Sequence, residues 1–166
     1  CYPIPTDWSH AFGIRRFGFH GLSVAWSLGR AGELLDRSPA SLGLVVAHLG
    51  GGCSVTAVDG GRSVDTSMGM TPLEGLVMGT RSGDIDPALH AHLARQEGWS
   101  LDEIDRVLNR ESGLKGMAGE NDFRELSRMV EAGDEAARLA FDVYCYRIRK
   151  YVGAYSAVLG RVDAIA

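Results

Sequence analysis

Apolar and turn-forming residues alternate across the middle of the chain and predict three consecutive strands. Leu44–Ala47 is a short apolar run typical of a buried strand, and β-like runs follow at 53–58 and 62–67. Gly50–Gly52 separates the first run from the second. Asp59-Gly60-Gly61 is a hairpin-turn signal, because glycine accepts positive φ without steric cost. The pattern therefore predicts strand, glycine turn, strand, hairpin turn, strand.

Helical spacing dominates the rest of the chain. Apolar residues recur three and four apart after Gly21, with Ser23 as a candidate cap, at Val24, Leu28, Ala31 and Leu35. Further helices are predicted at 87–97, at 100–108 behind a Ser100/Glu103 capping box, at 122–130 and at about 134–159.

The remaining segments carry prolines, glycines or short apolar runs. We expect an irregular lead-in at 1–14, a short strand at 14–19 and the opening of another strand at 162–166. Glycine-bearing loops are predicted at 68–84, with room for a turn or two of helix at 73–78, and at 112–121.

The glycine triplet Gly50–Gly52 has two interpretations. Three adjacent glycines let the backbone approach a ligand closely and leave N–H groups free to face an anion. A lone triplet is more often only a tight turn. This one lies between His48 and Ser54 at the tip of a predicted hairpin, which favours a phosphate cradle.

Composition narrows the class of protein. The 166 residues are 45% hydrophobic and 23% charged, which suits one globular domain or part of a larger one. A net charge of −4 argues against a nucleic-acid partner. No apolar run reaches the roughly 18 residues of a membrane span. Three widely spaced cysteines without metal-type spacing indicate reduced thiols in a cytoplasmic protein.

A long motif resembles the signature region of the acetate kinase family, which includes propionate and butyrate kinases. From His48 to Asp84 the chain reads H-L-G-G-G-C-S-V-T-A-V-D-G-G-R-S-V-D-T-S-M-G-M-T-P-L-E-G-L-V-M-G-T-R-S-G-D. The resemblance continues in R-F-G-F-H-G at 16–21 and G-E-N-D-F-R at 119–124, and so covers most of the chain. Two residues depart from the family pattern, Gly51 in place of the usual Asn and Leu22 in place of the usual Thr.

The resemblance implies an α/β fold of the actin-like ATPase (ribonuclease H-like) class. This chain would hold a partial domain, a three-stranded β meander followed by helices. Residues 1–41 would form the end of a first domain and the connection, and residues 42–166 a C-terminal kinase domain truncated at its end. Because the chain opens at Cys1 without Met, we expect an internal fragment. Because the resemblance implies that several residues of the family's active site are missing, we expect this fragment to be inactive alone.

The activity implied by the resemblance is reversible transfer of a phosphoryl group from ATP to acetate, giving acetyl phosphate and ADP, with Mg²⁺ and in a homodimer. Acetate and propionate differ by one methylene, worth only about 1–3 kcal/mol in an apolar pocket, so the acid stays open. The alternative is a non-catalytic nucleotide-binding module. His20 and Arg81 discriminate the two, since a binder needs neither.

The resemblance assigns catalytic roles to His20 and Arg81. His20 would stabilise the phosphoryl group during its transfer. A lone histidine, however, is more often only packed in the core or exposed to solvent. Arg81 would hold the substrate carboxylate and the transition state, because a guanidinium fork matches both carboxylate and phosphate. From composition alone, a surface arginine is an equal interpretation.

Two segments are implied to bind the nucleotide. His48, Leu49 and Gly50–Gly52 resemble a first phosphate loop, where Gly51 lacks the family's side-chain amide and contact must come from backbone or water. Asp122, Phe123 and Arg124 resemble a second contact near the adenosine. The same residues also suit an ordinary helix start capped by Asn121.

No metal ligand is assigned within the chain, and the magnesium ligands are expected outside it. Asp84 and Asp86 form a D-x-D, but Asp84-Ile85-Asp86-Pro87 is also a good helix-start sequence, which we prefer. Asp65 and Glu74 are assigned structural roles.

Overall fold

The computed structural model describes residues 2–166, and its backbone contacts divide the chain into two compact units. The first comprises residues up to Gly75 together with Arg149–Ala166, and the second comprises Leu76–Ile148. The long helix α7 (Glu135–Leu159) contributes residues to both. The boundary predicted between residues 41 and 42 refers to domains of longer proteins and stays a prediction.

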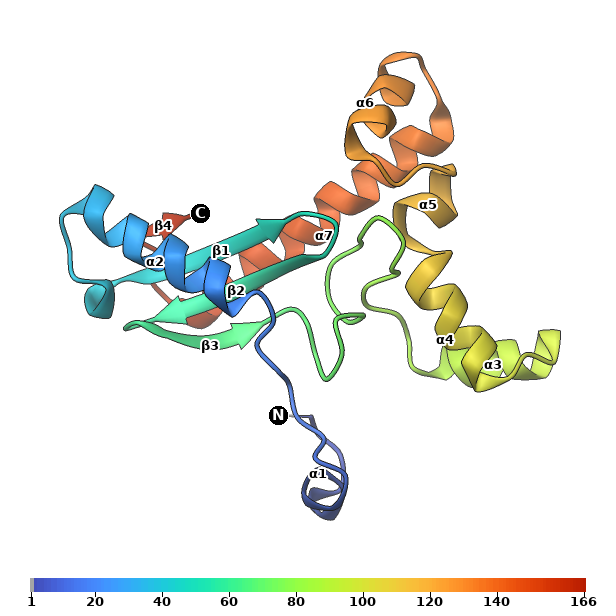
Figure 1. Cartoon of the computed structure of the whole chain (residues 1–166), viewed down its shortest axis with the longest axis horizontal. Helices are drawn as coiled ribbons and strands as arrows, with labels where there is room; N and C mark the ends of the chain where they lie inside the picture. The colour runs from blue at the N-terminus through green and yellow to red at the C-terminus, as the bar shows by residue number, and fades with distance from the viewer. Residues whose placement is uncertain (1) are drawn as a thin grey trace. The chain divides into compact units, whose positions relative to one another are not determined.

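A four-stranded sheet forms the centre of the first unit (Figure 1). Its strands are β1 (Gly43–Leu49), β2 (Cys53–Asp59), β3 (Arg62–Thr66) and β4 (Ala164–Ile165), in the order β3-β2-β1-β4. The predicted three-stranded meander is confirmed, since β1–β2 and β2–β3 pair antiparallel. The strand expected at 162–166 is also present and pairs parallel with β1.

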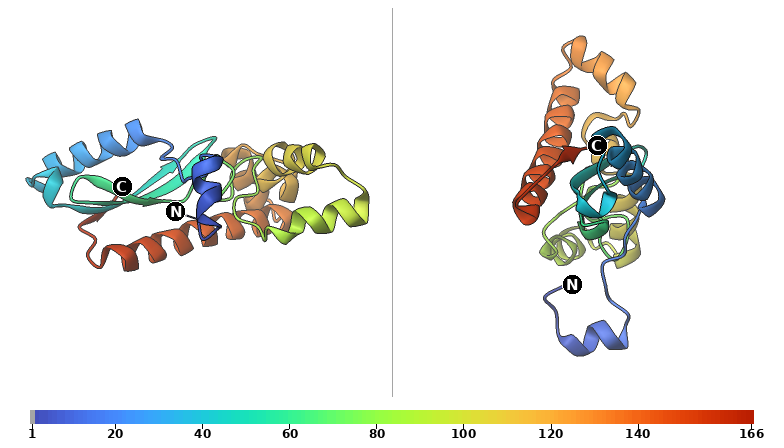
Figure 2. Two further views of the ribbon diagram at one scale, coloured as in Figure 1. Left: turned by 90° about the horizontal axis from the view of Figure 1, so that it is seen from below. Right: turned by 90° about the vertical axis from the view of Figure 1, so that its left-hand side faces the viewer.

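Helices cover both faces of this sheet. Helix α2 (Gly21–Leu35) lies on one face, and the C-terminal turns of α7 lie on the other (Figure 2). Beneath α2, buried apolar residues of helix and strands form one core, which consists of Val24, Ala31, Leu42, Leu44, Val46 and Val58. The apolar stripe predicted for the helix therefore faces the sheet through Val24 and Ala31.

The second unit is helical. It contains α3 (Ala88–Glu97), α4 (Leu101–Arg110), α5 (Gly113–Ala118), α6 (Phe123–Glu131) and the first part of α7. The predicted capping box is present, because Ser100 Oγ accepts from the Glu103 amide and the Glu103 carboxylate accepts from the Ser100 amide. Its core consists of Val77, Leu114, Leu126, Ala137 and Ala140. The helices of the described chain are each too short or too polar to cross a bilayer.

Two segments predicted to be irregular are helical instead. Within 2–14 the chain forms the short exposed helix α1 (Thr6–Ala11). Within 112–121 it forms α5, whose first amides donate to the carbonyls of Met78 and Gly79. Those bonds come from a distant loop, so local glycine content could not reveal them. Residue 1 lies outside the described residues.

Two predicted ordered segments have no regular structure. Among residues 2–166, the segment 14–19 forms no strand; one backbone bond, from Phe17 N to Gly69 O at 3.0 Å, joins it to the loop after β3. The segment 73–78 forms turns and bends rather than helix. Both segments are therefore held by individual side-chain and backbone contacts rather than by a helix or a strand ladder.

Two predicted helix caps lie elsewhere. His20, not Ser23, is the N-cap of α2, and Asp122, not Asn121, is the N-cap of α6. Asp122 accepts from the Arg124 amide at 2.9 Å, as a cap does. Ser23 lies inside the first turn of α2, where its hydroxyl is available to another element.

Candidate functional site

The register of the β1–β2 hairpin places a histidine and a serine opposite each other beside the start of α2. Side chains of a strand alternate between faces, so every second pair faces the helix. Along the hairpin these pairs are Leu44 with Val58, Val46 with Thr56, and His48 with Ser54. Leu44, Val46 and Val58 contribute to the core under α2, whereas the last of these pairs is polar and lies near the glycine turn.

The first turn of α2 supplies a matching histidine and serine. His20 is the N-cap in a left-handed conformation with φ of 60°, and Ser23 follows three residues later. The His20 Nδ1 atom lies 2.8 Å from Ser54 Oγ, and His48 Nδ1 lies 3.0 Å from Ser23 Oγ. Each histidine therefore bonds the serine of the other element.

The two imidazole rings also stack. The ring centroids of His20 and His48 are 3.9 Å apart and the rings are inclined by 11°. Four side chains from α2, β1 and β2 thus form one compact polar cluster, which we call the histidine–serine cluster: His20, Ser23, His48 and Ser54. It joins a residue predicted to be catalytic to one predicted to lie in the phosphate loop.

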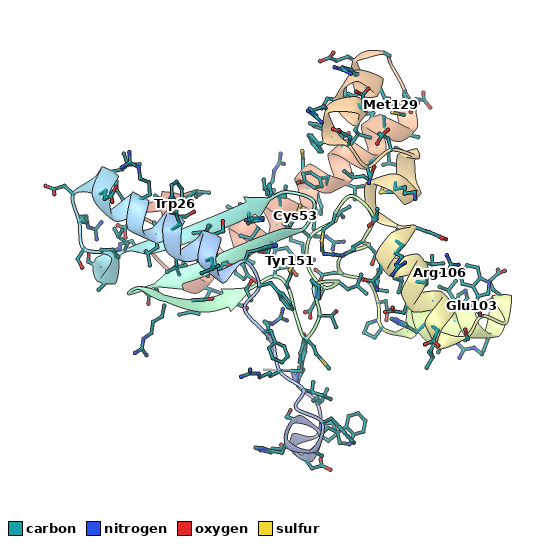
Figure 3. The ribbon with its side chains drawn as sticks, viewed as in Figure 1. Trp26, Cys53, Glu103, Arg106, Met129 and Tyr151 are labelled. Carbon is teal, nitrogen blue, oxygen red and sulfur yellow. The ribbon has the colours of Figure 1, made fainter. Side chains whose placement is uncertain are left out.

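The glycine turn lies against this cluster. Gly50 N donates to Gly52 O at 3.2 Å, and Cys53 at the start of β2, labelled in Figure 3, directs its Sγ to Gly50 O at 3.2 Å. A Cβ added to Gly50 would lie 3.6 Å from His48 Nε2, whereas a Cβ on Gly51 would meet nothing within 4 Å. Leu49, the last residue of β1, is exposed. A side chain at Gly50 would therefore contact His48, whereas a side chain at Gly51 would have free space around its Cβ.

A second group of side chains, not predicted as a cluster, holds the segment leading to His20. Arg16 Nη1 donates to the carbonyls of Thr66 at 3.1 Å and Met68 at 3.0 Å, while Nη2 donates to Glu74 Oε1 at 2.6 Å. Tyr2 Oη donates to Glu74 Oε2 at 2.5 Å and accepts from Met70 N at 2.8 Å. These bonds join the chain before His20 to the loop after β3. Glu74 has the structural role predicted for it.

This group shifts the pKa of two of its members. Burial raises the pKa of Tyr2 above its ordinary value, and the hydrogen bond to the Glu74 carboxylate raises it further. Burial is also the largest influence on the pKa of Arg16 and lowers it, but the hydrogen bond and charge of Glu74 outweigh burial and leave the pKa raised. Both side chains therefore stay protonated at neutral pH.

Arg81 lies in a loop of the second unit that the backbone holds firmly. Met78 N donates to Arg81 O at 3.1 Å, and Ser112 N donates to Thr80 O at 3.0 Å. Leu114 N at the start of α5 donates to Met78 O at 3.0 Å. The Arg81 side chain is half-buried, with Nη1 3.6 Å from Met78 Sδ. The loop is thus ordered around the residue predicted to bind the carboxylate.

The segment predicted as a second nucleotide contact begins α6. The Asp122 carboxylate accepts from Arg124 Nη2 at 2.8 Å and from the Arg124 amide at 2.9 Å. The Arg124 guanidinium and then its amide lower the pKa of Asp122 to about 2. The Phe123 ring contacts Phe141 and Tyr144, with centroids 5.4 and 5.0 Å away. The helix-start interpretation is therefore satisfied, and the nucleotide role stays a prediction.

The predicted site residues fall into two groups. His20, His48 and the glycine turn come together in the first unit, and Arg81 and Asp122–Arg124 belong to the second. Sequence reasoning had not assigned a role to Ser54, nor to Ser23 beyond capping. The signal available for them was their spacing, three residues after His20 and directly opposite His48 in the predicted hairpin.

The D-x-D of Asp84 and Asp86 is occupied by protein contacts. Asp86 Oδ1 accepts from Ala88 N at 2.9 Å at the start of α3, and Asp84 Oδ2 lies 3.4 Å from Arg147 Nη1. Within residues 2–166, no group of three or more His, Cys, Asp or Glu side chains is placed to hold a metal ion.

Comparisons with known proteins agree on one family. The profile of the Acetokinase family matches residues 1–166. Acetate kinase of Streptomyces griseus subsp. griseus is 58% identical over 165 residues, covering 99% of this chain and 40% of that protein. Acetate kinase of Syntrophobacter fumaroxidans is 53% identical over 164 residues, with 99% and 40% covered. The chain therefore spans about two fifths of the length of these relatives.

Solved structures give the same result for the fold. A Porphyromonas gingivalis acetate kinase superimposes with a TM-score of 0.97 at 43% identity, covering 99% of this chain and 42% of that one. A Francisella tularensis propionate kinase superimposes with a TM-score of 0.95 at 45% identity, with the same coverage. These matches confirm the predicted α/β, actin-like ATPase fold class.

Proposed function

Because the chain belongs to the Acetokinase family, we propose that it forms part of a kinase that transfers a phosphoryl group reversibly from ATP to acetate, giving acetyl phosphate and ADP. The observation that carries this proposal is the histidine–serine cluster, in which His20 and His48 stack at 3.9 Å beside the turn Gly50–Gly52. A module that only binds nucleotide has no need of two aligned imidazoles at a phosphate turn.

In the proposed reaction a carboxylate oxygen of acetate attacks the γ-phosphorus in line. The new P–O bond forms as the bond to the oxygen bridging the β- and γ-phosphorus breaks, and ADP leaves with that electron pair. Little covalent chemistry falls to the protein, so catalysis depends on positioning and on stabilising charge. His20 would donate a hydrogen bond to the oxygens of the transferring group.

Arg81 is proposed to bind the carboxylate and the charge that develops on the phosphoryl oxygens. Its loop is held by backbone bonds from Ser112 and Leu114, which limits its freedom before substrate arrives. A guanidinium offers paired donors that match both groups. His48, Leu49 and the glycine turn are proposed to contact the nucleotide phosphates, and Asp122, Phe123 and Arg124 the nucleoside.

Magnesium, a homodimer and a cytoplasmic location are further proposals drawn from the family. A divalent ion bound to ATP would supply charge neutralisation. We assign no step to the ion in this chain.

A short-chain acid other than acetate is the second candidate. It is favoured by the match to the propionate kinase structure, whose 45% identity is close to the 43% of the acetate kinase structure. One methylene changes binding by only about 1–3 kcal/mol, so overall similarity does not decide between the acids.

A chimera tests both candidates. The matching residues of the Streptomyces griseus acetate kinase are replaced by this chain, and acyl phosphate is trapped with hydroxylamine in the presence of ATP, magnesium and each acid from formate to butyrate. We expect turnover, with the highest kcat/KM for acetate. Highest kcat/KM for propionate would favour the second candidate.

Arg81→Ala in the chimera should lower kcat/KM by about 100-fold or more, the usual effect of removing one transition-state donor. The matched control is Arg110→Ala, an exposed arginine at the end of α4, which should leave turnover unchanged. A folded chimera that binds ATP but forms no acyl phosphate with any acid would indicate a binding module instead. Normal turnover of Arg81→Ala would contradict the role of Arg81.

A further inference from the structure

The histidine–serine cluster has a reciprocal arrangement that goes beyond the two histidines themselves. From it we infer that Ser54 and Ser23 are positioning residues, whose hydroxyls donate to Nδ1 of His20 and His48 and hold both rings with the proton on Nε2. Each ring then presents an N–H donor at Nε2. The use of these N–H donors in catalysis rests on the proposed function. The tautomer of each ring is a property of this chain and can be measured without activity.

The distances settle which ring nitrogen is engaged. Ser54 Oγ lies 2.8 Å from His20 Nδ1, and Ser23 Oγ lies 3.0 Å from His48 Nδ1. In a neutral imidazole one nitrogen donates and the other accepts, so a hydroxyl that donates to Nδ1 leaves the proton on Nε2. For His48 that nitrogen faces the glycine turn, 3.6 Å from the position of a Cβ on Gly50.

The required chemistry favours this tautomer over the other. Phosphoryl oxygens accept hydrogen bonds, so a ring nitrogen that faces them must carry a proton. The opposite tautomer would direct a lone pair toward an anion. The stack also disfavours a doubly cationic pair, because two cationic rings with centroids 3.9 Å apart would repel each other.

The spacing of the four residues makes the histidine–serine cluster rigid. His20 and Ser23 lie one helical turn apart on α2, and His48 and Ser54 are a directly opposed pair of the hairpin. Any slide of α2 along the sheet would break both hydrogen bonds together. Ser54 is almost fully buried, with 1% of its surface exposed, so its hydroxyl has little freedom to turn elsewhere.

Nitrogen NMR on the 166-residue chain, labelled at histidine nitrogens, tests the inference without any assay of activity. Spectra are recorded at about pH 8.5, above the ordinary titration range of histidine. His20→Asn and His48→Asn assign the signals. We expect both rings to carry the proton on Nε2, with Nδ1 shifted by an accepted hydrogen bond. A proton on Nδ1 of either ring would overturn the inference.

Two alanine variants separate the two bonds. Ser54→Ala should raise the minor tautomer of His20 about fivefold, the effect of one net hydrogen bond, and should leave the tautomer of His48 unchanged. Ser23→Ala should do the reverse. Because Ser23 is half-buried on a helix and alanine favours helix, this variant keeps the test available if Ser54→Ala does not fold. Ser23→Thr, which restores a hydroxyl, should restore the signal of His48.

Thr56→Val is the matched control. Thr56 is buried on the same face of β2 as Ser54, and its hydroxyl lies 3.2 Å from Thr66 Oγ1 rather than near a histidine. It should leave both histidine spectra unchanged. Equal changes in Thr56→Val and Ser54→Ala would show a general effect on the hairpin and overturn the inference, as would unchanged spectra in both serine variants.

Activity gives a second, separate readout. In the chimera, Ser54→Ala should lower kcat about tenfold or more and change KM for ATP little, since the donor matters most in the transition state. A chimera without turnover would contradict the proposed function and leave the tautomer result standing. The wrong tautomer in an active chimera would contradict this inference alone.

Discussion

The guanidinium of Arg16 and the carboxylate of Glu74 meet with Nη2 and Oε1 2.6 Å apart, across 58 residues of sequence. The same guanidinium donates to the carbonyls of Thr66 and Met68. One side chain thus joins the segment that leads to His20 to the end of β3 and the loop beyond it. The contact anchors the chain four residues before His20, the N-cap of α2.

Arg16→Lys should destabilise the first unit although it keeps the charge. An ammonium cannot replace two guanidinium nitrogens that bond a carboxylate and two carbonyls at once. With side chains 25% and 33% exposed, the group is partly screened, and we expect a loss of about 1–2 kcal/mol in the free energy of unfolding in urea.

Arg30→Lys is the control for that measurement. Arg30 and Glu33 also meet at 2.6 Å, but their side chains are 52% and 67% exposed. Exposed pairs contribute little, so this variant should cost at most about 0.5 kcal/mol. Equal losses in the two variants would show that the Arg16 contacts have no special weight.

Asp163→Asn should weaken the dependence of stability on pH. The amide of Gly43, and then the side chain of Arg37, lower the pKa of Asp163 in the folded protein. Stabilisation by a lowered carboxyl pKa is fully present above the unfolded value of about 3.9 and is lost as pH falls through the folded pKa. The free energy of unfolding should thus fall less between about pH 6 and pH 3 in the variant than in wild type.

Asp142→Asn is the matched change for this comparison, because Asp142 is an exposed acid on α7. In this variant the free energy of unfolding should fall between about pH 6 and pH 3 by as much as it does in wild type. If Asp163→Asn shows that difference too, the bond between Asp163 and the start of β1 does not contribute to acid stability.

Gly113→Ala should disturb the loop that carries Arg81. Gly113 has φ of 62°, and a Cβ there would collide with Met78 O and lie 2.6 Å from Arg81 O. The left-handed conformation alone costs about 1–2 kcal/mol for other residues, and the collision adds to it. We expect a clear drop in melting temperature and, in the chimera, a loss of kcat/KM.

Gly119→Ala provides the comparison on the same helix. Gly119 has φ of 77° at the end of α5, but a Cβ there would meet nothing within 4 Å. It should show only the conformational cost and keep kcat/KM. Equal kinetic effects of the two variants would argue against a role for the loop position.

Gly51→Asn should tighten nucleotide binding without loss of stability. The family resemblance implies Asn at this position, and a Cβ at Gly51 would meet nothing within 4 Å. If the glycine turn contacts phosphate as proposed, the added amide supplies one more donor, worth about fivefold in KM for ATP in the chimera. Gly51→Ala, which adds the Cβ alone, should leave KM unchanged, and a similar gain in both variants would exclude the amide as its cause.

Much of the local structure could be predicted from the sequence. The β-like runs and glycine turns at 44–67 predicted β1, β2 and β3 within one or two residues, because a strand and a glycine turn each leave a short-range pattern. The capping box at Ser100 and the long helix α7 were also predicted, because a cap and an apolar helical stripe depend on residues three or four apart. The family followed from motifs of adjacent residues, and the family profile confirms it.

Structure that depends on distant partners could not be predicted in this way. Helix α5 was predicted as a loop because its glycines outweigh its propensity locally, and its first amides bond the carbonyls of Met78 and Gly79. Ser23 was predicted as a cap, yet its hydroxyl lies at His48, 25 residues away. These outcomes depend on where a loop or a strand lies, which no short-range pattern records.

The sequence by itself determined that His20 precedes a helix and that His48 and Ser54 flank the glycine turn of a hairpin, since helix starts and turns leave patterns among neighbouring residues. The directly opposed register of His48 and Ser54 came from the structure. Only the tertiary structure decided that the helix lies on that face with its first turn over the end of the ladder. Burial of the apolar stripe of α2 against Leu44, Val46 and Val58 sets this position. The polar ends of helix and hairpin then meet, and the two histidines stack.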